Sequence, residues 1–115
     1  MTTLMNKKTN TTLIPRLGIA DGFWARGKGL LGRSSLSADE ALWIHRCNSI
    51  HTYFMKFPID CVFVDRQLQV KRIYRNVGPW KFIFPVWGAS SVIEMAAGTA
   101  TNLHINVGDQ LHVGA

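Results

Sequence analysis

Residues 49–65 read Ser-Ile-His-Thr-Tyr-Phe-Met-Lys-Phe-Pro-Ile-Asp-Cys-Val-Phe-Val-Asp, and this stretch decides the fold class. Its second half, Ile59 to Val64, is a short apolar run after a Phe-Pro break, a pattern typical of a buried strand. Asp60 lies inside this run, although aspartate is depleted in strands and costly to bury alone. We therefore expect Asp60 to have a partner, in a structural polar cluster or in a binding site.

Extended segments continue on both sides of this strand. Residues 69–75 follow it after Arg66-Gln67-Leu68, which predicts a hairpin with a short loop. Other predicted extended segments cover residues 11–17, 19–26, 41–47, 90–96 and 110–113. Short helical pieces are predicted at 37–40 and 98–104, the second capped by Thr99. Many short strands with one or two short helices indicate a mainly β domain, a β-sandwich or jelly-roll-like barrel.

The chain is long enough for one domain with a single core, since 47% of its 115 residues are hydrophobic. Residues 1–10 are polar without periodicity and predict a flexible N-terminal arm, which leaves 11–115 as the β-rich domain. Apolar runs stay below the roughly 18 residues of a membrane span. The first residues also lack the apolar stretch of a signal peptide. We therefore expect a cytoplasmic protein.

The chain is basic, with 13 Lys and Arg against 7 acidic residues and a net charge of +6. Such a balance suits a nucleic-acid or anionic-membrane partner. The basic residues are scattered, however, and their densest group is Lys71, Arg72 and Arg75 on a predicted strand. Because no RNA-binding motif accompanies them, the sequence does not favour nucleic acid. It leaves a small molecule or a protein as partner and does not determine the oligomeric state.

Three blocks of residues, in order along the chain, carry a family resemblance. They are Arg26-x-x-Gly29-Leu30-Leu31-x-Arg33-x-x-Leu36, then His51-Thr52-x-Phe54-Met55-x-Phe57-Pro58-Ile59-Asp60-x-x-Phe63-Val64-Asp65, then Val92-x-Glu94-x-x-x-Gly98 followed by Val107-Gly108-Asp109. Together they resemble the signatures of the domain of unknown function 192 family. The resemblance covers about residues 17–113 and implies a small β-rich sandwich of jelly-roll type, with no assigned activity.

The chain departs from that family at one place. Many members carry Phe-Trp-Met-Lys-Asn-Thr where residues 53–58 here read Tyr-Phe-Met-Lys-Phe-Pro. An apolar pair thus replaces a polar pair, and a role of the polar pair elsewhere is not carried over to this chain.

The first functional hypothesis is a module that binds a small molecule or peptide in a cleft. Polar and sulfur groups among aromatics indicate where such a cleft would lie, with an aromatic wall from the loop at Trp80. The residues assigned to it are His51, Thr52, Met55, Asp60 and Trp80. Arg26 and Arg33 are expected to pair with Asp60 or Glu94 as structural polar groups.

Two alternatives remain open at this stage. The aromatic loop from Trp80 to Trp87 could be an exposed patch that docks a protein partner in assembly. The chain could instead be an enzyme or metal protein that uses His45, Cys47 and His51, with Cys61 as a further zinc-type donor and with His51 as a base oriented by Asp60. The cysteines lack C-x-x-C spacing, and free cysteine usually packs as a small core residue. The sequence therefore assigns no cofactor and no metal ligand, and it leaves enzymatic activity undetermined.

Overall fold

The computed structural model describes residues 2–22, 30 and 32–114. Its largest sheet has five strands in the order β3-β4-β9-β6-β7. Their bounds are β3 Arg16–Ala20, β4 Glu40–Ile44, β6 Ile59–Val64, β7 Val70–Val77 and β9 Ser91–Ala96. β3 and β4 run parallel, and the other neighbours are antiparallel. The predicted hairpin of β6 and β7 is confirmed.

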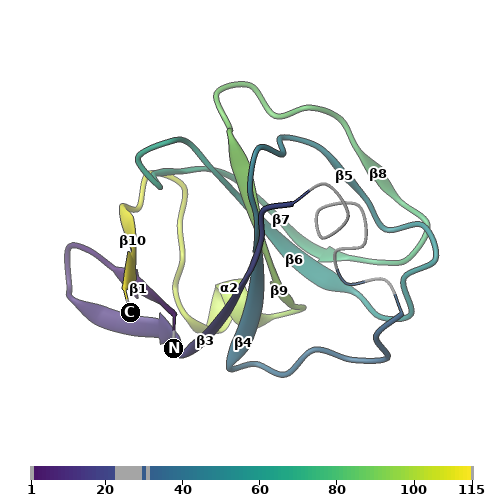
Figure 1. The fold of residues 1–115 in the computed structure, drawn as a ribbon, viewed down its shortest axis with the longest axis horizontal. Coiled ribbons are helices and arrows are strands. Elements are labelled where there is room, and N and C mark those ends of the chain that lie inside the picture. Colours follow the sequence, from purple (N-terminus) through teal and green to yellow (C-terminus); the bar gives the residue numbers. More distant parts are fainter. Residues whose placement is uncertain (1, 23–29, 31, 115) are drawn as a thin grey trace.

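Two smaller sheets cover the large one. One has the order β10-β1-β2, and the other pairs β5 with β8. Their bounds are β1 Thr3–Asn6, β2 Thr11–Ile14, β5 Ile50–His51, β8 Phe82–Ile83 and β10 Leu111–Gly114. Figure 1 shows the five-stranded sheet in the middle, with β1, β2 and β10 on one side and β5 and β8 on the other. The mainly β prediction is confirmed for the described residues, whose strands form these three sheets.

Each face of the central sheet packs its own core. Val62, Val64 and Ile93 face a cluster that includes Leu4 and Leu111 of the small three-stranded sheet. Cys61, Phe63 and Val92 face a second cluster that includes Ile50 of β5 and Ile83 of β8. Successive strand residues point to opposite faces, so a strand covered on both sides has no position left for solvent. This explains why all six residues of β6 are buried.

The structure differs from the sequence-based prediction at the N-terminus. A flexible arm was predicted over residues 1–10, whereas Thr3–Asn6 form β1 between β2 and β10. Leu4 is fully buried there. Four residues are too few to show a strand period, and the partner β10 lies at the other end of the chain. β1 is thus a central strand of its sheet, paired with the adjacent β2 and with the distant β10.

Other strands and helices also have bounds that differ from the sequence-based prediction. Pro15 separates β2 from β3, so the predicted strand over 11–17 is divided. A turn with a hydrogen bond from Glu40 N to Ser37 O replaces the predicted helical piece at 37–40. The helix α2 covers only Thr99–Asn102, and Gly98 rather than Thr99 is its N-cap. Gly98 takes a φ of 89°, which only glycine adopts easily. In the described part of the chain, no helix has the length and apolar character needed to cross a bilayer.

Candidate functional site

Asp60 forms a structural cluster on one face of the central sheet. Its side chain is fully buried. One carboxylate oxygen accepts a hydrogen bond from Asn76 N at 2.8 Å and the other accepts one from Ala100 N at 2.9 Å. These bonds tie β6 to β7 and to the first turn of α2. Charge-assisted bonds of this kind satisfy a buried carboxylate without a cation, so the partner of Asp60 is the backbone.

The predicted arginine pairs are not found among the described residues. Arg33 was expected to pair with Asp60 or Glu94, but its guanidinium lies 2.7 Å from Glu40 Oε1. Arg26 lies outside the described residues. The correction has a physical reason: Arg33 is about half exposed beside β4, whereas Asp60 and Glu94 are buried within the sheet.

Glu94 is the second buried carboxyl, and its surroundings differ from those of Asp60. It lies on β9 between Cys61 of β6 and Leu42 of β4. Burial raises its pKa from 4.5 to about 7. Burial also raises the pKa of the Cys61 thiol, with smaller contributions from Glu94 and Asp60. In both cases the low-dielectric environment favours the neutral form of the group.

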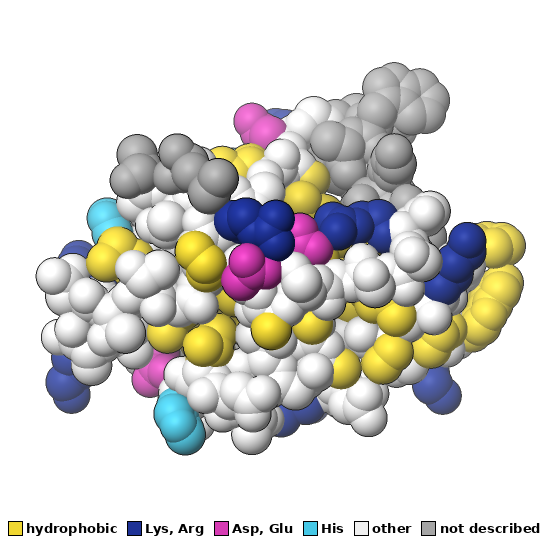
Figure 2. All heavy atoms as spheres, turned by 90° about the horizontal axis from the view of Figure 1, so that it is seen from below, with side chains coloured by type: hydrophobic (Ala, Val, Ile, Leu, Met, Phe, Trp, Pro, Cys, Tyr) yellow, Lys and Arg dark blue, Asp and Glu magenta, His cyan; other side chains and the backbone are white. Residues whose placement is uncertain are grey.

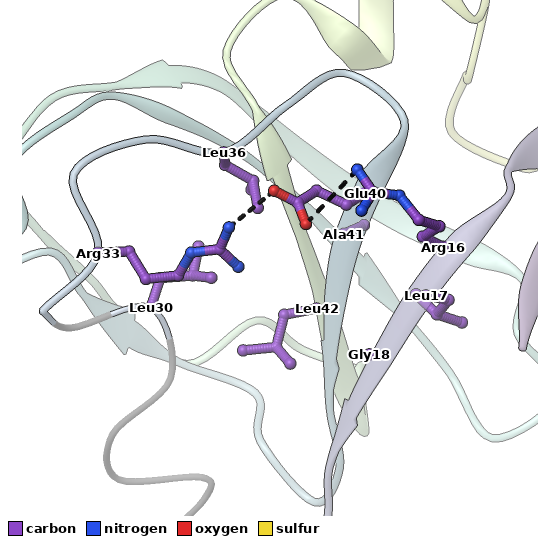
Figure 3. Close-up of a pocket in the computed structure, with 9 residues that line it drawn as sticks. All are labelled: Arg16, Leu17, Gly18, Leu30, Arg33, Leu36, Glu40, Ala41 and Leu42. Atoms are coloured by element: carbon purple, nitrogen blue, oxygen red, sulfur yellow. Dashed lines mark hydrogen bonds and ion pairs between the residues drawn. The ribbon is translucent and has the colours of Figure 1, made fainter. Parts of the chain in front are cut away.

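A hollow of about 270 Å³ opens beside β3 and β4 (Figure 3). Leucine side chains form its apolar part, namely Leu17, Leu30, Leu36 and Leu42. At its rim, Arg16 contacts Asp39 at 2.8 Å and Arg33 contacts Glu40. The two cations and two carboxylates neutralise one another. The rim therefore gives little electrostatic selectivity for a charged ligand, and we assign no function to the hollow.

The donors of the metal alternative do not converge. No group of three or more His, Cys, Asp or Glu side chains is positioned to hold a metal within the described ranges. His45 Nδ1 lies 3.2 Å from Asp21 Oδ1. The Cys47 thiol donates to Ser49 O at 2.9 Å, and Cys61 is buried as a free thiol. The described geometry thus gives the metal alternative no support.

Thr52 joins the end of β5 to the loop before β8. It is only 1% exposed. Its hydroxyl donates to Gly78 O at 2.6 Å and accepts from Lys81 N at 2.8 Å. Its backbone N donates to Lys81 O, and its backbone O accepts from Trp80 N and Met55 N. The two loops are therefore held in one fixed arrangement.

Six exposed aromatic side chains project from these two loops, from β8 and from the segment that follows β8. We call them the aromatic surface, which comprises Tyr53, Phe54, Trp80, Phe82, Phe84 and Trp87. Phe54 is 69% exposed, Trp80 60% and Trp87 97%. Figure 2 shows hydrophobic side chains gathered at the right-hand edge, the side where β5 and β8 lie in Figure 1.

Ring contacts join the side chains of the aromatic surface in two groups, one around Trp80 and one of Phe82 with Phe84. The Trp80 ring lies 4.7 Å from Phe54 and 6.1 Å from Tyr53, measured between centroids. Phe82 and Phe84 make an edge contact at 5.0 Å. His51 stacks on Tyr53 at 4.8 Å and extends the surface along β5. The rings thus hold one another in place.

Two residues of the aromatic surface have strained backbones. Phe54 has a φ of 66° and Trp80 a φ of 65°. Bulky L-residues avoid this left-handed region, at a cost of roughly 1–2 kcal/mol each. The hydrogen bonds of Thr52 to the neighbouring backbone hold Trp80 in this conformation. Such strain clusters at functional sites because only the surrounding structure maintains it.

The structure separates the residues that the sequence assigned to one cleft. His51, Thr52 and Trp80 lie together on β5 and the adjoining loop, whereas Met55 is buried in the core beneath them. Asp60 binds α2 on the opposite face of the central sheet. Phe54 was not among the predicted site residues. The signal available was a pair of consecutive aromatics, Tyr53-Phe54, outside any predicted strand.

Comparison with known proteins identifies the family. The model of the DUF192 family, described as "Uncharacterized ACR", matches residues 4–113. A UPF0127 protein of Thermococcus sibiricus is 32% identical over 112 residues, which cover 94% of this chain and 72% of that protein. A UPF0127 protein of Pyrococcus horikoshii is 28% identical, with 94% and 96% covered.

A solved structure has the same fold. It is the crystal structure of a protein of unknown function from Novosphingobium aromaticivorans, with a TM-score of 0.82 and 24% identity. The match covers 96% of this chain and 82% of that one. The family match over nearly the whole chain, together with the relative in Thermococcus, confirms the resemblance seen in the three sequence blocks. The chain belongs to the DUF192 family, whose members are uncharacterised.

Proposed function

We propose that this protein is a binding module that docks a protein partner through the aromatic surface. One observation carries the proposal: Phe54 and Trp80 are held in the left-handed region with their rings packed together and exposed. Solvent-exposed tryptophan and phenylalanine in one group are costly to keep unless they are used. Tryptophan and tyrosine are also enriched among the residues that dominate binding energy in interfaces.

The contacts of Asp60 and Thr52 favour a surface over a cleft. A cleft holding His51, Thr52 and Asp60 needs polar groups free to contact a ligand. Both Asp60 oxygens accept backbone bonds, and the Thr52 hydroxyl both donates and accepts. These groups therefore support the fold around the aromatic surface. The side chains left for a partner are the rings themselves, with His51 at their edge.

Selection from a displayed peptide library tests the proposal. We expect the full chain to enrich peptides that then bind in solution, and Trp80→Ala to weaken each of them by about tenfold or more. Ile19→Ala and Val107→Ala serve as matched controls, because both residues are exposed apolar side chains outside the aromatic surface. Thermal unfolding of each variant checks that it folds. Peptides that bind Trp80→Ala as tightly as the parent chain would overturn the proposal.

A further inference from the structure

We infer that the segment docked on the aromatic surface is acidic, with carboxylates next to its apolar side chains. This inference rests on the proposed function and adds the chemistry of the partner. The residues that would contact those carboxylates are Lys56 and Lys81.

The sequence around the aromatic surface contains no acidic residue. Residues 41–59 and 66–93 supply β5, β8 and both loops, and neither stretch contains an aspartate or a glutamate. The nearest acids in sequence are Asp60 and Glu94, which are buried in the central sheet. Neither presents a carboxylate at this surface, and the charged residues of these two stretches are all lysine or arginine.

Lys56 and Lys81 are exposed within or beside the aromatic surface. Lys81 lies between Trp80 and Phe82 in the chain, and Lys56 lies two residues after Phe54. Neither lysine has an ion pair among the residues that the structure describes. Figure 2 shows Lys and Arg side chains next to the hydrophobic edge.

The opposite arrangement is found beside β3 and β4. There Arg16 contacts Asp39 at 2.8 Å and Arg33 contacts Glu40 at 2.7 Å. Cations of the same chain are thus paired internally where acids are available. At the aromatic surface the complementary charge has to come from outside, and complementary charge steers and selects partners.

A membrane surface would also accept aromatic rings and lysines. The geometry favours a shaped partner instead. Phe54 and Trp80 are strained, and ring contacts and the bonds of Thr52 fix their positions. Such pre-organisation raises affinity for one complementary shape. A bilayer interface accepts a ring in many orientations and gains little from it.

Fluorescence anisotropy with three labelled peptides tests the inference on the full chain. The first is a short peptide of alternating tryptophan or leucine and aspartate. The second has asparagine for each aspartate, and the third has lysine. We expect the aspartate peptide to bind about tenfold more tightly than the asparagine peptide, to weaken as salt rises, and to bind more tightly than the lysine peptide.

Two charge-reversed double variants test whether Lys56 and Lys81 cause the preference for the aspartate peptide. Lys56→Glu with Lys81→Glu should abolish the preference for aspartate. Lys7→Glu with Lys8→Glu makes the same change in net charge at the turn between β1 and β2, where both lysines are exposed. This control should retain the preference. If it loses the preference equally, overall charge explains the binding and the inference fails.

The remaining outcomes separate the inference from the proposed function. Equal binding of all three peptides, abolished by Trp80→Ala, would retain the docking surface and overturn the acidic partner. Absence of binding to all three would overturn both. Binding to phosphatidylserine vesicles but to no peptide would also overturn both and identify the surface as a membrane contact.

Discussion

The two faces of the central sheet place their buried carboxyl groups in different surroundings. On the face toward β1, β10 and α2, Asp60 has both oxygens satisfied by backbone N–H groups. On the face toward β5 and β8, Glu94 is buried in the sheet, and burial raises its pKa to about 7. The same side of the molecule carries the left-handed residues Phe54 and Trp80.

Left-handed non-glycine residues occur on both sides, and Asn10, Leu68 and His104 lie toward β1 and β10. At Phe54 and Trp80, however, the side chains are large, exposed and in contact with each other, whereas the bonds of Asp60 lie inside the core. We therefore expect substitutions on the first face to change stability, and substitutions at the aromatic surface to change binding more than stability. The following predictions test this contrast, from the largest effect to the smallest.

The largest effect is expected at Asp60. Asp60→Ala leaves the buried N–H group of Ala100 and the partly buried N–H group of Asn76 without an acceptor. Each unsatisfied buried donor costs about 1–3 kcal/mol, so the free energy of unfolding should fall by about 4 kcal/mol. Urea denaturation measures it. Asp109→Ala, whose carboxylate accepts one backbone bond at an exposed turn, is the control and should cost less. An unchanged midpoint for Asp60→Ala would contradict the structural role.

Glu94 should make stability depend on pH. Its pKa rises from 4.5 to about 7 on folding, so the folded state binds the proton more tightly. Stability from this group is complete below pH 4.5 and is lost as pH rises through 7. At about 1.4 kcal/mol per pH unit, the loss is about 3 kcal/mol. Glu94→Gln should remove this dependence in urea titrations across the same range. A variant that keeps the parent's pH profile would contradict the assignment.

Thr52 should contribute both to stability and to peptide binding. Thr52→Val removes the hydroxyl that contacts Gly78 O and Lys81 N while keeping the shape of the side chain. We expect a loss of about 2 kcal/mol in unfolding free energy. We also expect weaker binding of any peptide selected on the parent, although Thr52 is buried and cannot contact it. Thr12→Val, at an exposed position of β2, should change neither quantity.

The smallest change in stability is expected at Phe54. Phe54→Gly removes ring contacts with Trp80 but relieves a φ of 66°. The two effects offset each other to within about 1 kcal/mol, since glycine adopts this region freely. Phe82→Gly lacks that relief because Phe82 lies in β8, so it should be the more destabilising of the two. Both variants should lose peptide binding. A larger stability loss for Phe54→Gly than for Phe82→Gly would show that strain at Phe54 is minor.

The sequence by itself determined the elements with a strong local pattern. The apolar run of β6 and the short loop after it predicted the hairpin with β7, and the many short strands predicted a mainly β domain. The run of aromatics from Trp80 to Trp87 indicated an exposed patch, and Trp87 is indeed 97% exposed. A continuous apolar run, a short turn and a cluster of aromatics each involve residues that are close in sequence, so these features can be recognised from the sequence alone.

Which distant groups meet depends on the three-dimensional fold. β1 lies between β2 and the distant β10, and Asp60 accepts hydrogen bonds from Asn76 N of β7 and Ala100 N of α2. Arg33 contacts Glu40 rather than a buried acid because the fold places both beside β4. The left-handed conformations of Phe54 and Trp80 oppose local preference and are maintained by contacts between segments. Contacts between segments far apart in the chain leave no periodic signal in either one, and for this reason the sequence joined His51 and Asp60 in one site while the fold placed them on opposite faces.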